Sequence, residues 1–433
     1  MTPRLDQRQL AGLACFDSFG KTAMEMLAHG RRAGASTSLF LLELPGRRLS
    51  RRQLQEIRRI DRRTPVQLRR WKDLKALLAE LATCDALLLG LDGQRSRDTL
   101  LLSRAIWEGL VRRPLLVSAY PGILFRHQIE GMLDRSGVDL LCLNSPVDAD
   151  LYGGACRALG IDDGNAVVTG LPILWSLPPH RSRDRGSIVF FEQPSVPGNP
   201  LQRNYVARRL IDLAVAHPDR RVIFKPRTSS IEPTLHRRHG EMASLLAPLG
   251  RRHPNLHISY RPSLTLLRRC DCAITVSSTA AMEAMAMGIS TRIVADFGIC
   301  ETLGNHYFAA SGAVADFDAI IADPFRVTHR REWLEASGWR PDGAQRFLAA
   351  LVERLEGPPP PPSATSGGRP LGPPGWGTVS WQGYALANGG RKMLASAGSR
   401  SRHKASHRGK TLLRRLREQL VGLWGLEHWI KKR

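Results

Sequence analysis

The clearest candidate binding site in the sequence is a turn of three consecutive hydroxyl side chains: Ser277, Ser278 and Thr279. A short β-favouring run at residues 273–276 precedes this turn, and strong helix formers at 280–287 follow it before Gly288. Hydroxyls at this point favour a helix N-terminus, where unpaired N–H groups and a partial positive charge can bind phosphate. Glu283 comes one turn later, placed to reach a ribose hydroxyl beside that phosphate. An ordinary capped helix with a solvated Glu283 is the alternative.

Two cations stand just beyond another predicted strand. Residues 221–224 favour β structure and lead directly into Lys225, Pro226 and Arg227. An arginine can fork two hydrogen bonds to phosphate oxygens, so Arg227 in this turn is chemically suited to bind an anion. A solvent-facing turn is the alternative.

A carboxylate follows the first apolar run of the chain. Residues 10–16 predict a buried strand, a loop holds Asp17 and Ser18, and residues 21–32 predict a helix. Asp17 and Ser18 are therefore candidate contacts for an acceptor, and Asp17 is the candidate general base. A helix N-cap is an equally good interpretation of Asp17.

The hydroxyl turn and the following helix resemble the donor-nucleotide segment of GT-B glycosyltransferases, where an E-A-M-A-x-G run follows a Ser/Thr-rich turn. Here Ser278-Thr279 is followed by Glu283-Ala-Met-Ala-Met-Gly288-Ile-Ser. The segment is most similar to the branch with bacterial sialyl- and polysialyltransferases and glycerophosphate polymerases. It departs from the E-x7-E pattern of many retaining enzymes, because Thr275 stands eight residues before Glu283. Overall the chain resembles poorly characterised bacterial glycosyltransferase families over about residues 10–350.

The resemblance implies roles for further residues. Such families carry a K-P-H-P-like motif whose basic residue meets the donor phosphate, so the resemblance implies that Lys225 and Arg227 bind that phosphate. Here Arg227 replaces the histidine, and an arginine cannot act as an acid. The polar loop at 296–307 lies where such enzymes close over the sugar. Five residues are candidate sugar or acceptor contacts: Glu192, Gln193, Glu301, Asn305 and His306. A structural role is the alternative for His306.

Strand and helix patterns alternate along most of the chain and predict an α/β fold. We expect two Rossmann-like domains, and the resemblance implies that they face a cleft, as in GT-B proteins. The predicted acceptor domain covers residues 1–176 and the nucleotide-sugar domain covers 187–357. A Pro/Gly/Ser-rich stretch at 358–409 predicts a disordered linker, and residues 410–433 predict a basic amphipathic helix. In this fold, terminal helices often cross back to the first domain.

The charge of the chain favours anionic partners. The formal net charge is +24, and residues 358–433 contribute 14 Lys+Arg against 2 Glu. A second basic run, residues 47–72, holds eleven Lys+Arg against two acids, with pairs at helical spacing that indicate contact with phosphate or anionic lipid, or only a solvated face. The seven cysteines show no C-x-x-C or zinc spacing, which predicts a reduced protein without a metal or cofactor.

These observations predict a metal-independent glycosyltransferase that moves a sugar from a nucleotide-activated donor to a glycan or lipid-linked acceptor, in surface polysaccharide synthesis. A sugar-nucleotide epimerase on the same fold is one alternative. A basic nucleic-acid-binding protein is another, although no interleaved aromatics or finger spacing support specific nucleic-acid binding. No signal peptide or 18-residue apolar run is visible, so we expect a cytoplasmic protein. The tail helix predicts peripheral attachment to the inner face of the plasma membrane, or packing on a protein surface.

Overall fold

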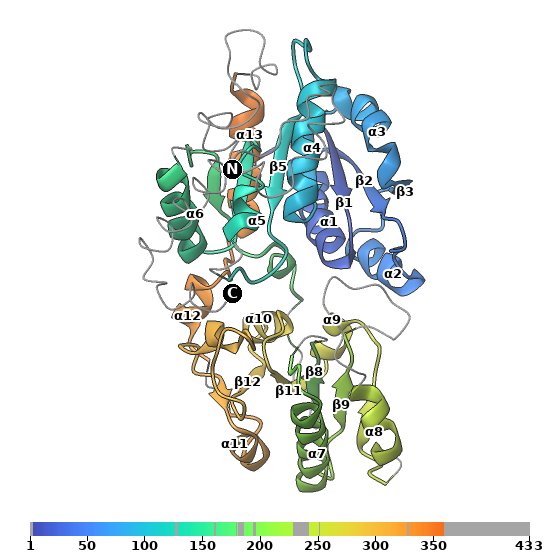
Figure 1. The fold of residues 1–433 in the computed structure, drawn as a ribbon, viewed down its shortest axis with the longest axis vertical. Helices are drawn as coiled ribbons and strands as arrows, with labels where there is room; N and C mark the ends of the chain where they lie inside the picture. Colours follow the sequence, from blue (N-terminus) through green and yellow to red (C-terminus); the bar gives the residue numbers. More distant parts are fainter. Residues whose placement is uncertain are drawn as a thin grey trace, which may run out of the picture.

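A computed structural model describes residues 3–125, 129–159, 162–178, 180, 186–193, 196–227, 242–250, 252–326 and 329–358 (Figure 1). The expected linker, from residue 359 onward, and the expected tail helix lie outside the described residues. Within these ranges, none of the helices is both long and apolar enough to cross a bilayer.

The described chain forms two parallel sheets in two lobes (Figure 1). The first sheet has the order β3-β2-β1-β4-β5-β6-β7 and the second the order β10-β9-β8-β11-β12-β13. The strands of the first sheet are β1 Gln9–Ala14, β2 Ser36–Glu43, β3 Val66–Arg70, β4 Ala86–Gly90, β5 Leu115–Ala119, β6 Leu140–Leu143 and β7 Ala166–Val168. Those of the second are β8 Ser187–Phe191, β9 Val222–Lys225, β10 Leu256–Ile258, β11 Cys270–Thr275, β12 Ser290–Val294 and β13 Val314–Ala315.

Helices connect the strands and cover the sheets. The first half contains α1 Asp17–Arg32, α2 Arg51–Ile60, α3 Leu74–Glu80, α4 Gly93–Ile106, α5 Ile129–Leu133 and α6 Pro146–Leu159. The second half contains α7 Pro200–Ala216, α8 Met242–Gly250, α9 Ser263–Leu267, α10 Ala280–Ala286, α11 Phe317–Ala322, α12 Arg331–Ala336 and α13 Gly343–Glu356. The predicted α/β fold with two Rossmann-like domains is confirmed.

The strand order identifies the binding edge of each sheet. In the first sheet β1 lies between β2 and β4, and in the second β8 lies between β9 and β11, so the order reverses beside β1 and β8. Ligands of open parallel sheets bind beyond the carboxyl ends of the strands at such reversals. Strands β4 and β8 are buried along their whole length, as expected for strands covered by helices on both faces.

The basic run at 47–72 contains more than one kind of element. Arg51–Ile60 forms the α-helix α2, and the edge strand β3 and a short 3-10 turn at Trp71–Asp73 follow it, so the arginine pairs do not share one helical face as their spacing indicated. A capping box between Ser50 and Gln53 starts α2, and extended backbone at Asp61 ends it. Strand β3 was not predicted, because its alternating half-exposed and charged residues lack an apolar run.

The last described helix belongs to the core of the first domain. Phe347 and Leu351 of α13 are fully buried there, and the Trp175 ring stacks on Phe347 with centroids 5.5 Å apart. The chain therefore passes between the lobes twice. The two passages touch each other, because the Leu171 N–H donates to the Gly338 carbonyl at 2.8 Å. The crossing back expected for a terminal helix is confirmed.

Candidate functional site

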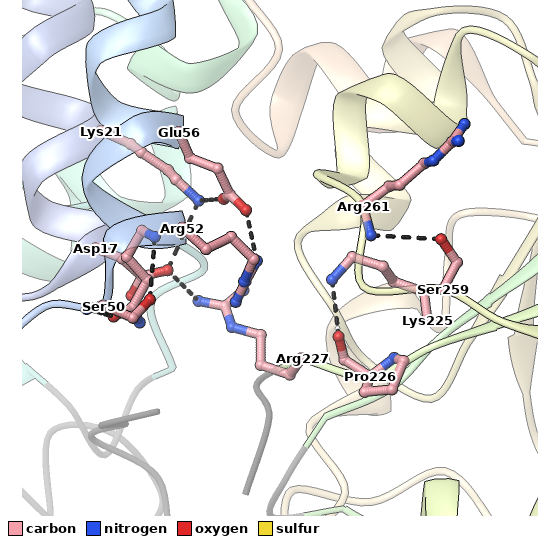
Figure 2. A network of polar contacts seen from close by, with 11 residues as sticks. Asp17, Lys21, Ser50, Arg52, Glu56, Lys225, Pro226, Arg227, Ser259 and Arg261 are labelled. Atoms are coloured by element: carbon pink, nitrogen blue, oxygen red, sulfur yellow. Dashed lines mark hydrogen bonds and ion pairs between the residues drawn. The ribbon is translucent and has the colours of Figure 1, made fainter. Parts of the chain in front are cut away.

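Charged side chains from both domains converge between the carboxyl ends of β1 and β9 (Figure 2). Asp17 and Lys21 start α1, Arg52 and Glu56 lie on α2, and Lys225 and Arg227 end or follow β9. With Glu283 of α10, which the same cations influence, these residues form what we call the interdomain cluster. Four cations and three carboxylates thus meet at the edge where ligands of this fold class bind.

Asp17 lies directly after the residue that turns the chain from β1 into α1. That residue, Phe16, has φ 62°, a left-handed conformation uncommon for a non-glycine residue. Asp17 Oδ2 lies 3.7 Å from Lys21 Nζ and 3.9 Å from an Arg227 guanidinium nitrogen. Burial would raise the pKa of Asp17, but Arg227, Lys21 and the Ser18 N–H outweigh it and hold the pKa below its usual range. Asp17 is therefore an ionised carboxylate at neutral pH.

Glu56 binds two cations that face the second domain (Figure 2). Its carboxylate lies 2.5 Å from Lys21 Nζ and 2.5 Å from an Arg52 guanidinium nitrogen. The sequence analysis did not assign Lys21, Arg52 or Glu56 to the site. Their contact depends on the packing of α1 against α2, and in the sequence Arg52 is one of many arginines of a basic run.

Lys225 is a buried cation with a lowered pKa. Its Nζ donates to the Pro226 carbonyl at 2.7 Å, and its side chain points toward the interdomain space (Figure 2). Burial, and then the positive charges of Arg52, Arg227 and Lys21, lower its pKa to about 8, although Glu56 acts in the opposite direction. A phosphate bound beside Lys225 would favour its ammonium form and so act against the burial and repulsion that lower this pKa.

Glu283 lies in the field of the same cations. Burial raises its pKa to about 7, although Lys21, Arg227 and Lys225 all favour the charged form. The structure therefore pairs Asp17 with Arg227, and it places Glu283 where the same arginine acts on its charge.

The three hydroxyls of the predicted turn differ in their surroundings. Ser277 Oγ lies 2.6 Å from Gln193 Oε1 and 2.5 Å from the Leu303 carbonyl, so it joins three loops. Ser278 is buried, and its Oγ accepts a hydrogen bond from the Ala280 N–H at 3.3 Å. Thr279 is half-buried, makes no capping hydrogen bond, and lies opposite Gly122 of the first domain. Of the three residues, Thr279 is the one that lies opposite the first domain, and its hydroxyl does not cap α10.

Glu192 and Gln193 hold the carboxyl edge of the second sheet together. Glu192 is buried and paired with Arg203 at 3.1 Å, and its N–H donates to the Lys225 carbonyl at 3.0 Å. Burial raises the pKa of Glu192, and Arg203 opposes that rise. Gln193 Nε2 donates to the Ser277 carbonyl at 2.9 Å. The Glu192 backbone thus holds the strand end that carries Lys225, and the Gln193 side chain holds the hydroxyl turn.

The remaining predicted contacts are spread out. Asn305 is fully buried and uses both its amide protons and its oxygen on the loop at 294–300, so it shapes that loop. Glu301 is exposed and Ser18 half-buried. The rings of His306 and Phe125 of the first domain have centroids 5.3 Å apart, and the buried His306 Nδ1 has no hydrogen-bond partner among the described residues. Of these four, His306 alone is shown beside a residue of the opposite domain.

Across the part of the chain that the structure describes, no group of three or more His, Cys, Asp or Glu side chains could hold a metal ion. Between the domains, the positive charges that could neutralise a bound anion are the cationic side chains of the interdomain cluster.

Solved structures share this fold at low sequence identity. A "putative UDP-N-acetylglucosamine 2-epimerase" from Listeria monocytogenes has a TM-score of 0.56 and 14% identity, covering 81% of this chain and 97% of its own. The Neisseria meningitidis UDP-GlcNAc 2-epimerase has a TM-score of 0.52 and 11% identity, covering 80% and 99%. Arabidopsis thaliana UGT89C1 also has a TM-score of 0.52 and 11% identity, covering 82% and 99%. These similarities confirm the GT-B fold.

No curated protein has a significantly similar sequence. A family model does match, over residues 10–355, which include both sheets and every residue of the interdomain cluster. The chain therefore belongs to the glycosyltransferase family described as "Putative glycosyltransferase (DUF6716)".

Proposed function

We propose that this glycosyltransferase takes its sugar from a nucleotide-activated donor, whose phosphate binds Lys225 and Arg227, and passes it to a glycan or lipid-linked acceptor. The observation that carries the proposal is the convergence of Asp17 with Arg227 and Glu283 from the opposite domain. Two proteins of the same fold support a nucleotide-sugar donor. The N. meningitidis structure is bound to UDP-GlcNAc, and the A. thaliana structure is complexed with UDP-L-rhamnose.

The proposed reaction needs a base and a stabilised leaving group. Asp17 takes the proton of the acceptor hydroxyl as that oxygen attacks the anomeric carbon. The bond from the anomeric carbon to the phosphate oxygen breaks, and the nucleotide leaves with the electron pair. Lys225 and Arg227 then neutralise the charge that develops on the phosphate. Thr279 adds a hydroxyl beside that phosphate, and Glu283 binds the ribose. In this scheme Glu301 and His306 remain candidates for contacts with the sugar.

A thermal-shift screen with nucleoside mono- and diphosphates and their sugars tests the donor site, because a ligand that binds only the folded state raises the melting temperature. We expect Arg227→Gln to reduce the shift strongly. Arg261→Gln is the matched control, since Arg261 is an exposed cation of the same domain that follows β10 (Figure 2). Equal shifts for wild type and Arg227→Gln would exclude the proposed phosphate site.

Products then separate the transferase from the alternative enzyme. Incubation with a nucleotide sugar and no acceptor should leave the sugar configuration unchanged. Interconversion of the donor to its epimer, with no acceptor required, would instead identify a sugar-nucleotide epimerase.

We further propose that the lipid-linked acceptor is met at an anionic membrane surface. Four arginines at the end of α2 and just beyond it are exposed: Arg58, Arg59, Arg62 and Arg63. Such a patch is attracted to acidic lipid headgroups by about 1 kcal/mol per cation near the surface. This proposal places the protein in the cytoplasm, on the inner face of the plasma membrane, in surface polysaccharide synthesis.

Flotation with phosphatidylcholine vesicles, with and without phosphatidylglycerol, tests membrane binding. Changing all four arginines to glutamate should abolish binding to the acidic vesicles if the patch is the contact. Loss of binding only after deletion of residues 410–433 would assign the contact to the tail.

A further inference from the structure

Arg227 faces two anions at different stages of the proposed reaction. Its guanidinium lies 3.9 Å from Asp17 Oδ2, which belongs to the opposite domain (Figure 2). In the donor complex the same guanidinium is assigned to the phosphate. Because both partners are oxyanions that would bind the same guanidinium, each reduces the affinity of that guanidinium for the other.

The surroundings of Asp17 allow this exchange. Its other ion-pair partner is Lys21 at 3.7 Å, which Glu56 holds at 2.5 Å. The charged groups around Asp17 are Lys21 on its own helix, Arg52 and Glu56 on α2, and Arg227 after β9. When Arg227 leaves, Lys21 and Arg52 remain on the side of the first domain, so Asp17 keeps a counter-ion and stays charged.

We propose that Asp17 occupies Arg227 in the empty enzyme and that the donor phosphate displaces it, so that Asp17 acts as a built-in competitor of donor binding. This inference rests on the proposed function. Its consequence is an order of events: with Arg227 on Asp17, the base is masked and its proton affinity is low. With Arg227 on the phosphate, the carboxylate becomes available to the acceptor hydroxyl and binds a proton more strongly. Binding of the donor thus frees Asp17 to act as the general base.

The competition predicts that substitution of Asp17 changes nucleotide affinity in a direction that a purely structural or catalytic role would not produce. Removing the competitor should tighten nucleotide binding, so we expect Asp17→Asn to lower the Kd for a nucleoside diphosphate by two- to fivefold. That range is about what a partly exposed ion pair contributes. The probes are the nucleoside diphosphates UDP, GDP and ADP, and calorimetry measures their Kd at a fixed ionic strength and neutral pH.

A double-mutant cycle separates the exchange from a general field effect, because Asp17→Asn also removes a negative charge near the phosphate. In an Arg227→Gln background the tightening by Asp17→Asn should shrink or vanish. Asp92→Asn is the matched control: Asp92 caps α4 after the neighbouring strand β4 and pairs with Arg95, and Asn is an equally good cap. It should leave the Kd unchanged. Melting temperatures of all variants verify folding.

Three results would overturn the proposal. If wild type binds a nucleotide and Asp17→Asn binds it equally or more weakly, the competition is absent while the donor site stands. If the tightening is the same in both backgrounds, it is a field effect and Arg227 does not change partner. If no nucleotide binds either chain, the proposed donor site fails and the exchange fails with it.

Discussion

Gln193 and Ser277 are joined by two hydrogen bonds across the carboxyl edge of the second sheet. The Gln193 amide donates to the Ser277 carbonyl at 2.9 Å, and the Ser277 hydroxyl lies 2.6 Å from the Gln193 oxygen. The first hydroxyl of the predicted phosphate turn is thus committed to holding that turn beside β8. Gln193→Ala should cost about 1–3 kcal/mol of unfolding free energy, because it leaves buried polar groups unpaired. Urea unfolding of Gln193→Ala, Ser277→Ala and the double variant should show that the losses of unfolding free energy are strongly non-additive. Additive losses would mean that the pair does not act as a unit.

Substitutions at Ser278 and Thr279 should have different effects, one on stability and the other on nucleotide binding. Ser278→Ala removes the acceptor for the Ala280 N–H and should lower stability by about 1 kcal/mol. Thr279→Val keeps the shape of a half-buried side chain without a capping bond, so we expect an unchanged melting temperature and a weaker nucleotide-induced shift. An unchanged shift in Thr279→Val would remove Thr279 from the site.

Lys225 should make nucleotide affinity depend on pH. Its pKa is lowered to about 8, and a bound phosphate favours the ammonium, so binding raises this pKa and takes up a proton above pH 8. Affinity should therefore fall as pH rises from about 7 to 9, where the nucleotide phosphate itself is already ionised. Calorimetry in buffers of different ionisation enthalpy measures the proton uptake. Lys225→Arg, which does not titrate in this range, should give a flat profile; a profile like that of wild type would assign the proton elsewhere.

Glu283 should make stability depend on pH in the opposite sense to most carboxylates. Burial raises its pKa from 4.5 to about 7, so between these values the folded state holds a proton that the unfolded state has lost. Stability from this group is present below pH 4.5 and is lost as pH rises through 7. Glu283→Gln should therefore melt higher than wild type at pH 8 but not at pH 4. The exposed Glu301→Gln should match wild type at both pH values.

Gly343 is the first residue of α13, and it is packed so closely against the first domain that a side chain would not fit. A Cβ there would overlap the Thr169 carbonyl and meet Trp175 Nε1 at 2.5 Å. Gly343→Ala should therefore displace α13 from the first domain and lower the melting temperature by several degrees. At Gly122 the nearest atom to a new Cβ is Thr279 Cγ2 at 3.5 Å, an ordinary contact, so Gly122→Ala should melt like wild type. Similar melting of both variants would contradict this packing argument.

Much of the fold could be predicted from local pattern. Buried parallel strands such as β1 and β9 follow apolar runs, and their predicted ranges, residues 10–16 and 221–224, differ from the observed bounds by two residues or less. Strand β3 could not be found, because an edge strand in a basic run lacks that signal.

The candidate site was only partly visible in the sequence. Asp17 was indicated by its position just after a strand, Arg227 by the motif that follows another strand, and Glu283 by its place one turn into a helix that begins at the hydroxyl turn. Residue type alone could not show that Glu192 is committed to Arg203, or that Asn305 is committed to its own loop. Nor could it show that Glu56 gathers Lys21 and Arg52, because this contact depends on how two helices pack.

The contact between Leu171 and Gly338 ties the two passages between the lobes at one point. Asn144 borders Gly338 there, and its amide also holds the Gly122 carbonyl, so the Gly122–Thr279 contact lies close to this pivot. Asp17 and Arg227 meet just beyond the carboxyl ends of β1 and β9, several strands away from this point in each sheet. For a rigid rotation of one lobe, displacement grows with the lever arm. A small opening would consequently move Arg227 away from Asp17 while leaving Thr279 almost in place.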